Sequence, residues 1–510
     1  MSSRVVSVKT AMLWGVEARL VQMEVSVNSG LPGIAVVGRA DQSVGEGRTR
    51  VRCALTASGF SGLRKSVTVS LSPADMKKTG SSFDLPMAVG VLVALEQIEP
   101  AGLDGCLIVG ELSLEGEVLP IRGLVAYAQL AQREGLRLIC PRGDTFDLLG
   151  DADVRHVCYL SEFHEPLCNV GVPATGSLDM GGLARPADMA DFADVAGQEL
   201  AKRALCIAAA GGLGILMVGP PGVGKTMLAR CVPSILPDLS DEEYYQTAII
   251  YSVCGEEGQC VGGRRRPFRA PHHTTSAPGL LGGGKPVMPG EVSLAHNGVL
   301  FLDELGEFSR MTLQALRQPL EEGVVRVTRV EGTYSFPARF QLVAASNPCP
   351  CGHFGDPGAT CTCSEAAVRA YQAKLAGPLV DRIDMAVTLE RPSADELLGR
   401  GACTSSEKLR AVVEETREFA AWRESQAQGK ADEGMGVHGK LAQALVRLGA
   451  DEGASCLVEH MSERQGISVR GLSSLVKVAR VIADMEGSAA LRDAHLLEAY
   501  GFRYGEGEAS

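Results

Sequence analysis

Strand-like alternation of apolar and polar residues dominates the first third of the chain. It is clearest at Ala18–Val27 and Ser66–Ser72, and a helical pattern lies between them at Ser43–Ser58. A period of two predicts strands with one buried face, and a period near 3.6 predicts an amphipathic helix. Residues 1–172 are therefore expected to form a mixed α/β domain.

In the middle of the chain, from residue 191 to 390, short β-rich runs alternate with helical patterns. The runs are Gly214–Val218, Val299–Leu302 and Phe340–Ala345. Such alternation predicts a parallel sheet covered by helices on both faces. The long apolar stretch Ala204–Val218 contains glycines, and we predict that it is a buried strand rather than a membrane helix.

Two stretches of turn-forming residues separate these parts from the rest. Residues 173–190 are rich in Gly, Pro and small side chains and predict a linker, and residues near Gln426–Gly439 predict a loop. The remainder of 391–510 has helical periodicity, at Lys440–Leu448 and Leu472–Met485. We expect a carboxy-terminal helical domain.

The composition is that of a globular protein with several domains, because 510 residues that are 45% apolar can fill several cores. The net charge of -12 argues against a uniformly basic surface for nucleic acid, although an acidic exterior can enclose a basic pore. The amino terminus has no secretory signal pattern, so we expect a cytoplasmic protein without a membrane segment. Its 15 cysteines should then be reduced, and any cluster of them is a candidate metal site.

A phosphate-binding motif of the form G-x-x-x-x-G-K-[ST] lies between a predicted strand and a predicted helix. Its residues are Gly219, Pro220, Pro221, Gly222, Val223, Gly224, Lys225 and Thr226. Glycines let backbone N–H groups wrap the phosphates, Lys225 neutralises phosphate oxygens, and the Thr226 hydroxyl binds Mg²⁺. The motif predicts an ATP site.

Further polar residues follow the later strands. Asp303 and Glu304 end the second run, where Asp303 would hold Mg²⁺ and Glu304 would orient and deprotonate the attacking water. Asn347 ends the third run and is a candidate sensor of the γ-phosphate. Arg382 and Arg470 are candidates for stabilising charge on the transferred group, a role that a neighbouring subunit often supplies. An isolated arginine is usually a surface charge, so these two depend on the ordered set.

Several segments together resemble one family. The segments are DFADVAGQELAKRAL, GPPGVGKTML, RPFRAPHHTTS, GVLFLDEL, AASNPCPCG and GPLVDRID. They are similar to the YifB/ComM family of Mg-chelatase-like AAA+ ATPases, and the resemblance covers essentially the whole chain. It implies an α/β fold: an AAA+ P-loop NTPase core of the helix-2-insert clade at 191–390, a Lon-protease-like (ribosomal S5 domain 2-like) α+β domain at 1–172, and a helical lid at 391–510.

The resemblance also implies a function and further site residues. The family's ComM proteins are hexameric, ATP- and Mg²⁺-dependent helicases that drive DNA branch migration in natural transformation and recombination. By this resemblance Val195, Gly197 and Gln198 border the adenine, Arg382 is a finger acting across the subunit interface, and Arg470 is the second sensor. Two alternatives remain: a chelatase-type ATPase that remodels a protein partner, and an ATP-dependent protease.

The interval between Thr226 and Asp303 is longer than one helix, strand and helix need, so an insertion is expected there. It holds a basic run at 264–269, a glycine loop with a lysine, and the pair His272-His273, which we interpret as a polar contact rather than a metal site. A second candidate is a β-hairpin at Val324–Phe340 with its turn at Glu331-Gly332, because such hairpins line the pore in this clade. The predicted DNA contacts are Arg266, Arg269, Lys285, Arg326 and Arg329. The alternative for the basic run is a solvated loop.

The segment PADMKKTGSSFDLPMAVGVL resembles the part of Lon that carries the catalytic serine, and Ser82 lies nearest that position. Val125 takes the place of the Lon lysine. A serine without a base is a weak nucleophile, so we predict an inactive scaffold domain. Lys77 or Lys78 is the alternative base.

Four cysteines follow Asn347 in the pattern C-x-C-x₉-C-x-C, namely Cys349, Cys351, Cys361 and Cys363. Four soft ligands separated by turn-forming residues can wrap tetrahedrally around Zn²⁺, and we predict a structural zinc site. His353 could replace one ligand, and four reduced thiols in a loop are the alternative.

Overall fold

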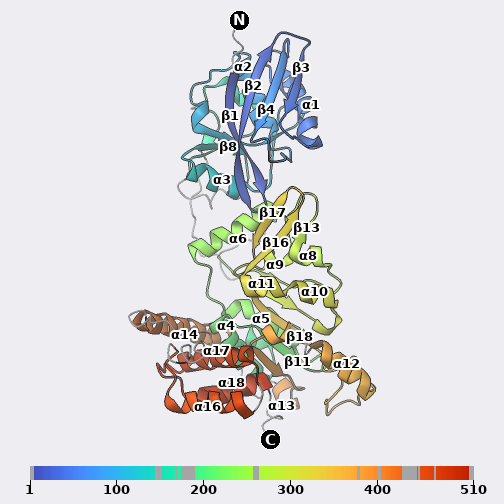
Figure 1. The fold of residues 1–510 in the computed structure, drawn as a ribbon, viewed down its shortest axis with the longest axis vertical. Coiled ribbons are helices and arrows are strands. Elements are labelled where there is room, and N and C mark those ends of the chain that lie inside the picture. Colours follow the sequence, from blue (N-terminus) through green and yellow to red (C-terminus); the bar gives the residue numbers. More distant parts are fainter. Residues whose placement is uncertain are drawn as a thin grey trace.

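A computed structural model gives the fold of most of the chain. It describes residues 5–143, 152–167, 169–173, 190–256, 264–375, 379–398, 404–427, 445, 448–464 and 467–504. The molecule is elongated, with the amino-terminal domain at one end, the carboxy-terminal helices at the other, and the central α/β core between them (Figure 1). The predicted linker 173–190, the predicted loop 426–439 and the periodic segment 440–448 lie almost entirely outside the described residues.

The amino-terminal domain is built on one mixed sheet of eight strands, in the order β10-β9-β8-β5-β1-β2-β4-β3. Its strands are β1 (Val5–Trp14), β2 (Glu17–Asn28), β3 (Gly33–Val37), β4 (Ser66–Ser72), β5 (Cys106–Ile108), β8 (Arg137–Pro141), β9 (Val154–Val157) and β10 (Val172–Pro173). The helices are α1 (Gln42–Ala57), α2 (Asp84–Ala94) and α3 (Leu124–Arg133), and a short ladder joins β6 (Glu111–Leu112) to β7 (Val118–Leu119). The strands and the helix predicted from periodicity here are confirmed to within one residue at each end.

The central core holds a sheet of five strands in the order β12-β15-β18-β11-β19. Their bounds are β11 (Ile215–Val218), β12 (Phe268–Arg269), β15 (Val299–Leu302), β18 (Gln341–Ser346) and β19 (Met385–Thr388). Every pair of neighbouring strands is parallel, as predicted. All five carboxyl ends therefore lie at one edge of the sheet, where ligands bind in folds of this kind.

The prediction of one buried strand over Ala204–Val218 is wrong for its first half. Helix α4 (Glu199–Gly211) occupies that part and ends at Gly212, whose φ of 61° is the left-handed conformation typical of a helix end. Both elements are buried, so the run is apolar throughout and its periodicity does not separate helix from strand. No helix in the described parts of the chain is long and apolar enough to cross a lipid bilayer.

Residues of the core sheet alternate between two apolar layers. Met217, Phe301 and Val343 point to the layer that contains α4 and the carboxy-terminal helices. Leu300 and Leu342 point to the opposite layer, which continues into the amino-terminal domain. The helices of the first layer include α5 (Lys225–Ile235), α14 (Ser406–Ala427), α16 (Glu452–Arg464), α17 (Val469–Met485) and α18 (Asp493–Tyr504). The sheet is thus covered on both faces, as its apolar strands require.

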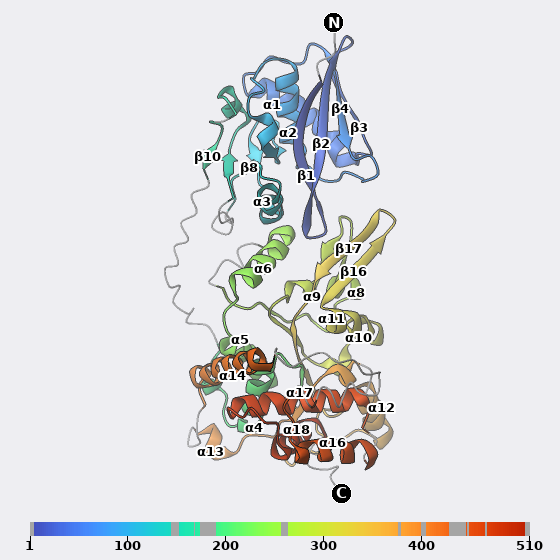
Figure 2. The same cartoon turned by 60° about the vertical axis from the view of Figure 1, so that its left-hand side comes forward.

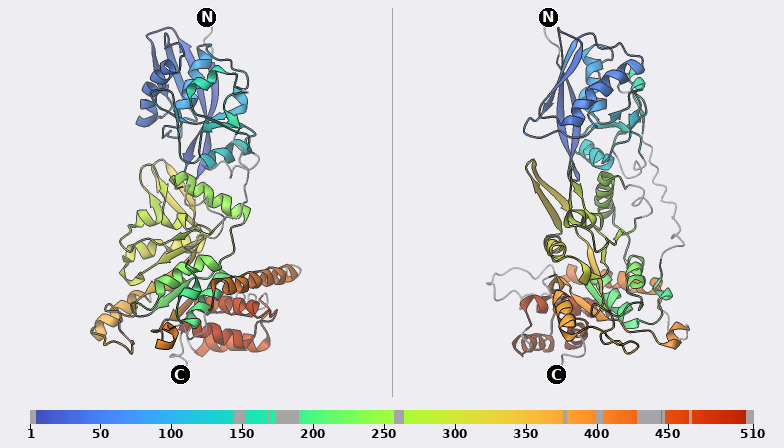
Figure 3. Two further views of the ribbon diagram at one scale, coloured as in Figure 1. Left: turned by 180° about the vertical axis from the view of Figure 1, so that it is seen from behind. Right: turned by 90° about the vertical axis from the view of Figure 1, so that its right-hand side faces the viewer.

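Extra elements inserted around the sheet form a layer between the core and the amino-terminal domain (Figure 3). They include α6 (Asp241–Cys254), α8 (Ala277–Leu281), β13 (Gly282–Gly283), β14 (Met288–Pro289), α9 (Glu291–Leu294), α10 (Arg310–Ala315), α11 (Arg317–Glu322), β16 (Val324–Arg329) and β17 (Gly332–Pro337). Strands β16 and β17 form an antiparallel hairpin, which confirms the hairpin predicted at 324–340. Its turn is Val330-Glu331 rather than the predicted Glu331-Gly332, because Gly332 is already paired with Arg329 in the ladder. Two further helices follow core strands along the chain: α12 (Glu365–Leu375) comes after β18, and α13 (Ala394–Leu397) comes after β19.

The amino-terminal domain is docked on this inserted layer at the end of the β1–β2 hairpin (Figure 2). The Trp14 ring stacks on Tyr334 with centroids 4.6 Å apart, and its indole N–H donates to the Thr333 carbonyl at 3.2 Å. On α6, the Ser252 carbonyl accepts from the Gly123 N–H at 2.9 Å. Since one apolar cluster also runs through both parts, the domain and the β16–β17 hairpin form one packed unit.

Candidate nucleotide-binding site

The predicted phosphate loop connects the carboxyl end of β11 to the first turn of α5. Gly222 and Gly224 have φ values of 81° and 97°, a conformation that glycine adopts without strain. A Cβ added at Gly222 would meet no atom of the described residues within 4 Å, so the loop borders open space. Backbone N–H groups at the start of a helix attract anions, and this geometry fits the phosphates of a nucleotide.

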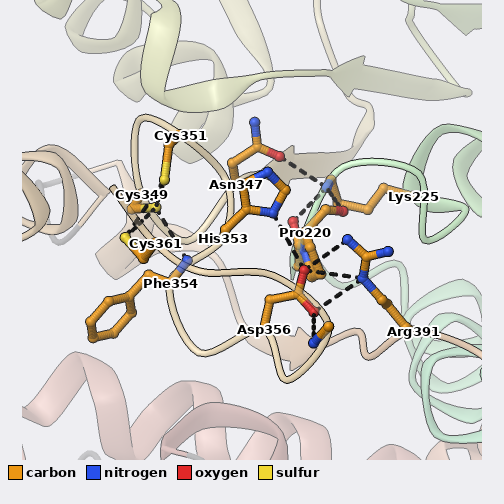
Figure 4. A network of polar contacts seen from close by, with 12 residues as sticks. Pro220, Lys225, Asn347, Cys349, Cys351, His353, Phe354, Asp356, Cys361 and Arg391 are labelled. Carbon is orange, nitrogen blue, oxygen red and sulfur yellow. Dashed lines mark hydrogen bonds and ion pairs between the residues drawn. The ribbon is translucent and has the colours of Figure 1, made fainter. Parts of the chain in front are cut away.

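Lys225 lies inside this loop. Its Nζ donates to the carbonyls of Gly219 at 2.6 Å and Pro220 at 2.9 Å, and to Oδ1 of Asn347 at 3.1 Å (Figure 4). Burial lowers the pKa of Lys225, while the neighbouring Asp303 and Glu304 carboxylates act in the opposite direction. An ammonium group in such a low-dielectric site interacts more strongly with an anion than it would in water.

The two predicted Mg²⁺ ligands lie in contact. The Thr226 hydroxyl donates to Oδ2 of Asp303 at 2.8 Å, which joins the first turn of α5 to the end of β15. Asn347 follows β18, which lies between β11 and β15 in the sheet, and its side chain contacts Lys225. Mg²⁺ prefers oxygen ligands such as this hydroxyl and this carboxylate. The arrangement of Lys225, Thr226, Asp303 and Asn347 therefore fits a Mg²⁺–nucleotide complex.

The backbone of Glu304 lies in the left-handed region, with φ of 51°, which is uncommon for a residue other than glycine. Its N–H donates to Oδ1 of Asp303 at 2.9 Å, and its Oε2 lies 3.2 Å from Nδ1 of His273. Strained backbone of this kind persists where the surrounding structure fixes it, and it clusters at functional sites. The sequence indicated a polar contact for the histidine pair, but the contact with Glu304 depends on the pairing of β12 with β15, which no local pattern shows.

The residues expected to border the adenine lie behind the phosphate loop. Val195 is buried, and a Cβ added at Gly224 would lie 3.7 Å from its side chain. The Gln198 amide donates to the carbonyls of Glu390 at 2.5 Å and Val223 at 3.4 Å. Gly197 has a φ of 61°, which disfavours a side chain, and a Cβ there would lie 2.6 Å from a Glu396 oxygen and displace that carboxylate. Their contact with adenine stays a prediction.

Arg382 and Arg470 lie elsewhere and converge on one carboxylate. Arg382 donates to Oε1 of Glu321 from Nε at 2.9 Å and from Nη2 at 2.6 Å, and Arg470 donates to the same oxygen. Arg382 precedes β19, whereas the phosphate loop follows β11, and these two strands are parallel and in register. A strand of four residues spans about 10 Å, so Arg382 lies at the edge of the sheet opposite its own phosphate loop.

The four cysteines predicted to bind zinc come together beside this site. Their sulfur atoms lie within 4.8 Å of one another, and the Sγ atoms of Cys349 and Cys361 are 3.8 Å apart. Zn–S bonds of about 2.3 Å in a tetrahedron need sulfur atoms just under 4 Å apart, so the set fits zinc. Backbone N–H groups of His353 and Thr362 lower the pKa of Cys351 to about 5, which favours the thiolate that binds metal, whereas desolvation and the neighbouring cysteines raise the pKa values of Cys361 and Cys363.

The loop that carries these cysteines packs against the phosphate loop (Figure 4). A Cβ at Gly352 would lie 2.7 Å from Cδ of Pro221. His353, the alternative ligand, lies 3.4 Å from Oδ2 of Asp356 and is not a member of the cysteine cluster. The Arg391 guanidinium binds Asp356 at 2.9 Å and lowers the pKa of that carboxyl to about 2. The cysteine loop is therefore held at two points, by Pro221 of the phosphate loop and by Arg391, which follows β19.

Comparison with known proteins finds matching families along most of the chain and similar proteins over nearly all of it. Residues 191–397 match the family described as magnesium chelatase, subunit ChlI, residues 23–144 match subunit ChlI of Mg-chelatase, and residues 403–503 match the ChlI carboxy-terminal family. The chain is 37% identical over 508 residues to the protein YifB of Salmonella typhimurium, covering 99% of this chain and 97% of that protein. It is also 37% identical over 501 residues to the competence protein ComM of Haemophilus influenzae, covering 96% and 95%.

The chain belongs to the YifB/ComM family. The matches to magnesium chelatase subunits make this a family of Mg-chelatase-like ATPases, and a family of that kind implies ATP and Mg²⁺ as ligands of the phosphate loop. The resemblance seen in the sequence is confirmed.

In this YifB/ComM family member, the residues predicted to contact DNA fall into two groups. Arg266 binds Glu243 at 2.9 Å and Arg269 binds Glu291 at 2.7 Å, and both side chains are mostly buried. These ion pairs give the basic run a structural role, so it is not a solvated loop at these positions. Arg326, Arg329 and Lys285 are exposed, and their contact with DNA stays a prediction.

In the amino-terminal domain, the described residues around Ser82 do not form a catalytic arrangement like that of the nucleotide site. Ser82 is almost fully buried and in hydrogen-bond contact with the Tyr127 hydroxyl, whose pKa burial raises to about 12. The Lys78 ammonium donates to the carbonyls of Pro73 and Met76. Val125, at the place expected for a lysine, is fully buried against α6. Within the described residues, the Ser82 hydroxyl thus contacts a phenol rather than an amine.

Proposed function

We propose that this protein is an ATP-driven motor that assembles into a homohexameric ring and moves branched DNA through its centre, as a helicase of branch migration. The observation that supports it most directly is the convergence of Lys225, Thr226, Asp303, Glu304 and Asn347 at one edge of the core sheet. A competence protein among the full-length relatives supports a role in natural transformation or recombination.

ATP hydrolysis follows from the roles of these side chains. Lys225 and the loop N–H groups hold the β- and γ-phosphates, and Thr226 with Asp303 would hold the magnesium ion that neutralises charge on them. Glu304 would orient the attacking water and accept its proton. His273, through Oε2 of Glu304, fixes the direction in which this carboxylate points.

Arg382 and Arg470 would complete the site of the next subunit. Since Arg382 lies at the edge of the sheet opposite its own phosphate loop, its guanidinium serves a nucleotide held by a neighbouring copy. An arginine supplied in trans stabilises the charge that builds on the transferred phosphoryl group. This arrangement supports a head-to-tail ring, because each interface then contains one complete site.

The DNA-contact surface would be the pair of hairpins above the core. In the β16–β17 hairpin, Arg326 and Arg329 lie on the first strand, and a Cβ at Gly283 would lie 3.3 Å from Nη2 of Arg329. The loop with Lys285 joins β13 to β14 beside it. Exposed cations on two adjacent hairpins fit the phosphate backbone, and binding should weaken as salt rises.

The first test is steady-state ATPase activity with no DNA, single-stranded DNA, duplex DNA and a four-way junction, at one moderate salt concentration. DNA, and the junction most strongly, is expected to stimulate hydrolysis. Arg326→Ala with Arg329→Ala should remove the stimulation while leaving hydrolysis without DNA unchanged. Val330→Ser, at the turn of the same hairpin, keeps both charges and is the matched control.

Two outcomes point elsewhere. ATP hydrolysis that no DNA stimulates would favour a chelatase-type motor that remodels a protein partner. Degradation of an unfolded protein such as casein, lost in Ser82→Ala, would favour an ATP-dependent protease.

We also propose that Cys349, Cys351, Cys361 and Cys363 hold a structural zinc ion. Their sulfur positions and the thiolate-stabilising N–H groups at Cys351 support it. Elemental analysis of the purified protein should find about one zinc per chain, and Cys361→Ser should lose it. Cys456→Ser, an exposed cysteine far along the chain, should keep it. Equal zinc content in both variants would refute the site.

A further inference from the structure

Glu321 holds two arginines that come from distant parts of the chain. Arg382 lies just before β19 in the core sheet, and Arg470 lies in the first turn of α17 in the carboxy-terminal helices. Both donate to the same oxygen, Oε1, so Glu321 fixes the spacing between them. This contact joins the core to the carboxy-terminal helices at the edge of the sheet away from the phosphate loop.

The charges explain why a carboxylate is needed at this place. Two guanidinium groups that reach one oxygen atom repel each other, and the carboxylate between them offsets that repulsion. Arg470 also lies at the amino end of a helix, where the helix dipole disfavours a cation. The hydrogen bonds from Arg470, and to a lesser extent from Arg382, lower the pKa of Glu321, so the carboxylate is ionised at neutral pH.

Glu321 does not serve the stability of its own helix. It lies in the last turn of α11, where the dipole disfavours an anion. Nearly half of its side chain is exposed, as is that of Arg470. Glu321 and Arg470 therefore lie at the surface, within reach of a second molecule, and they border the Arg382 side chain, of which 15% is exposed.

We propose that Glu321 is a positioning residue for ATP hydrolysis, which holds Arg382 and Arg470 as one unit on the face that meets the ATP of a neighbouring copy of the chain. The inference rests on the proposed action of Arg382 in trans. A preset pair of arginines meets the γ-phosphate without first being ordered, and such preorganisation is what makes charge stabilisation effective.

The neighbouring residue provides a matched control. Glu322 lies on the same helix and carries the same charge, but it binds Arg326 rather than Arg382 or Arg470. The full-length variants Glu321→Gln and Glu322→Gln are compared without DNA for kcat, for the KM of ATP and for ring assembly by analytical ultracentrifugation. Glu321→Gln should lower kcat on the order of tenfold, as expected for a misplaced charge-stabilising group, with KM and assembly unchanged. Glu322→Gln should match the parent, and Glu321→Asp should recover part of the loss.

Mixed rings test whether Glu321 acts on the neighbour's site. Lys225→Ala subunits lack a working phosphate loop but keep Glu321, so mixing them with Glu321→Gln subunits should raise activity above the sum of the separate preparations. No rise on mixing would overturn the inference, as would equal kcat in Glu321→Gln and Glu322→Gln. A higher kcat in Glu321→Gln would also overturn it, since Glu321 would then be restraining the arginines.

Arg382→Ala separates this inference from the proposed function. If Arg382→Ala hydrolyses ATP at the parental rate, the trans finger itself is wrong. If Arg382→Ala is inactive while Glu321→Gln equals its control, only the role of Glu321 fails.

Discussion

The core sheet and the amino-terminal domain both carry residues that resemble known catalytic sets, but they differ in what surrounds those residues. At the carboxyl ends of the core strands, Lys225 meets Asn347 and Thr226 meets Asp303. In the amino-terminal domain, Ser82 is buried against Tyr127, and Val125 packs against α6. In the core, the polar groups meet beside a loop that borders open space, whereas in the amino-terminal domain Ser82 and Val125 are enclosed by packed side chains.

The difference shows why a single resembling residue is weak evidence of chemistry. A nucleophile requires a base within hydrogen-bond reach, and an ATP site requires several groups aimed at one point. The core sheet satisfies this because parallel strands bring their carboxyl ends to one edge.

The largest effect is expected at Lys225. Lys225→Ala removes the cation that faces the phosphates and should lower ATPase activity by about a thousandfold or more. Fluorescent-nucleotide binding should be lost in parallel, while the far-ultraviolet circular dichroism spectrum stays unchanged. Retained nucleotide affinity would place the phosphates elsewhere and remove the contrast between the two regions.

Glu304→Gln should separate binding from chemistry at the same edge. The amide keeps the shape of the side chain but accepts no proton, so kcat should fall by about a hundredfold or more. ATP should still bind and should trap assembled rings, visible by size-exclusion chromatography. Hydrolysis at the parental rate would show that another group activates the water.

Trp14→Ala tests the packed interface that distinguishes the amino-terminal domain. Loss of the stack on Tyr334 and of the indole hydrogen bond should cost about 3 kcal/mol of stability. Trp422 is half exposed on α14, so Trp422→Ala is a control that should change stability by about 0.5 kcal/mol or less. Urea titrations followed by circular dichroism compare the two, and equal midpoints would mean that the docking contributes little.

Ser82→Ala is expected to have the smallest effect. The change removes one contact with Tyr127, and the loss should be about 1 kcal/mol. ATPase activity should stay within error of the parent, and no peptidase activity should be present to lose. A drop in casein degradation would instead assign chemistry to this serine.

The sequence predicted those parts of the site that lie within continuous segments. Gly219–Thr226, Asp303, Glu304 and Asn347 each follow an apolar strand, and that local context was enough to place them at one edge. The contact of His273 with Glu304 was not predictable, because it depends on the pairing of β12 with β15 rather than on a local pattern.

The contacts of the arginines were the hardest to predict from the sequence. Arg269 and Arg382 look alike in sequence, yet Arg269, on core strand β12, is held by the carboxylates of Glu256 and Glu291, and Arg382 lies with Arg470 at the sheet edge. The local sequence shows that a charge is present, but it does not indicate which distant carboxylate neutralises that charge. The helix at Glu199–Gly211 was missed for a related reason, because its residues 204–209 are all buried and therefore show no polar face.

The position of Arg382 at the edge opposite the phosphate loop has a consequence for how activity depends on assembly. In an open row of n subunits joined head to tail, the subunit at one end holds a nucleotide that no arginine reaches, so only n − 1 sites are complete. Closure of the ring completes the last site. Turnover per subunit should therefore rise with protein concentration and reach its limit only when every row has closed.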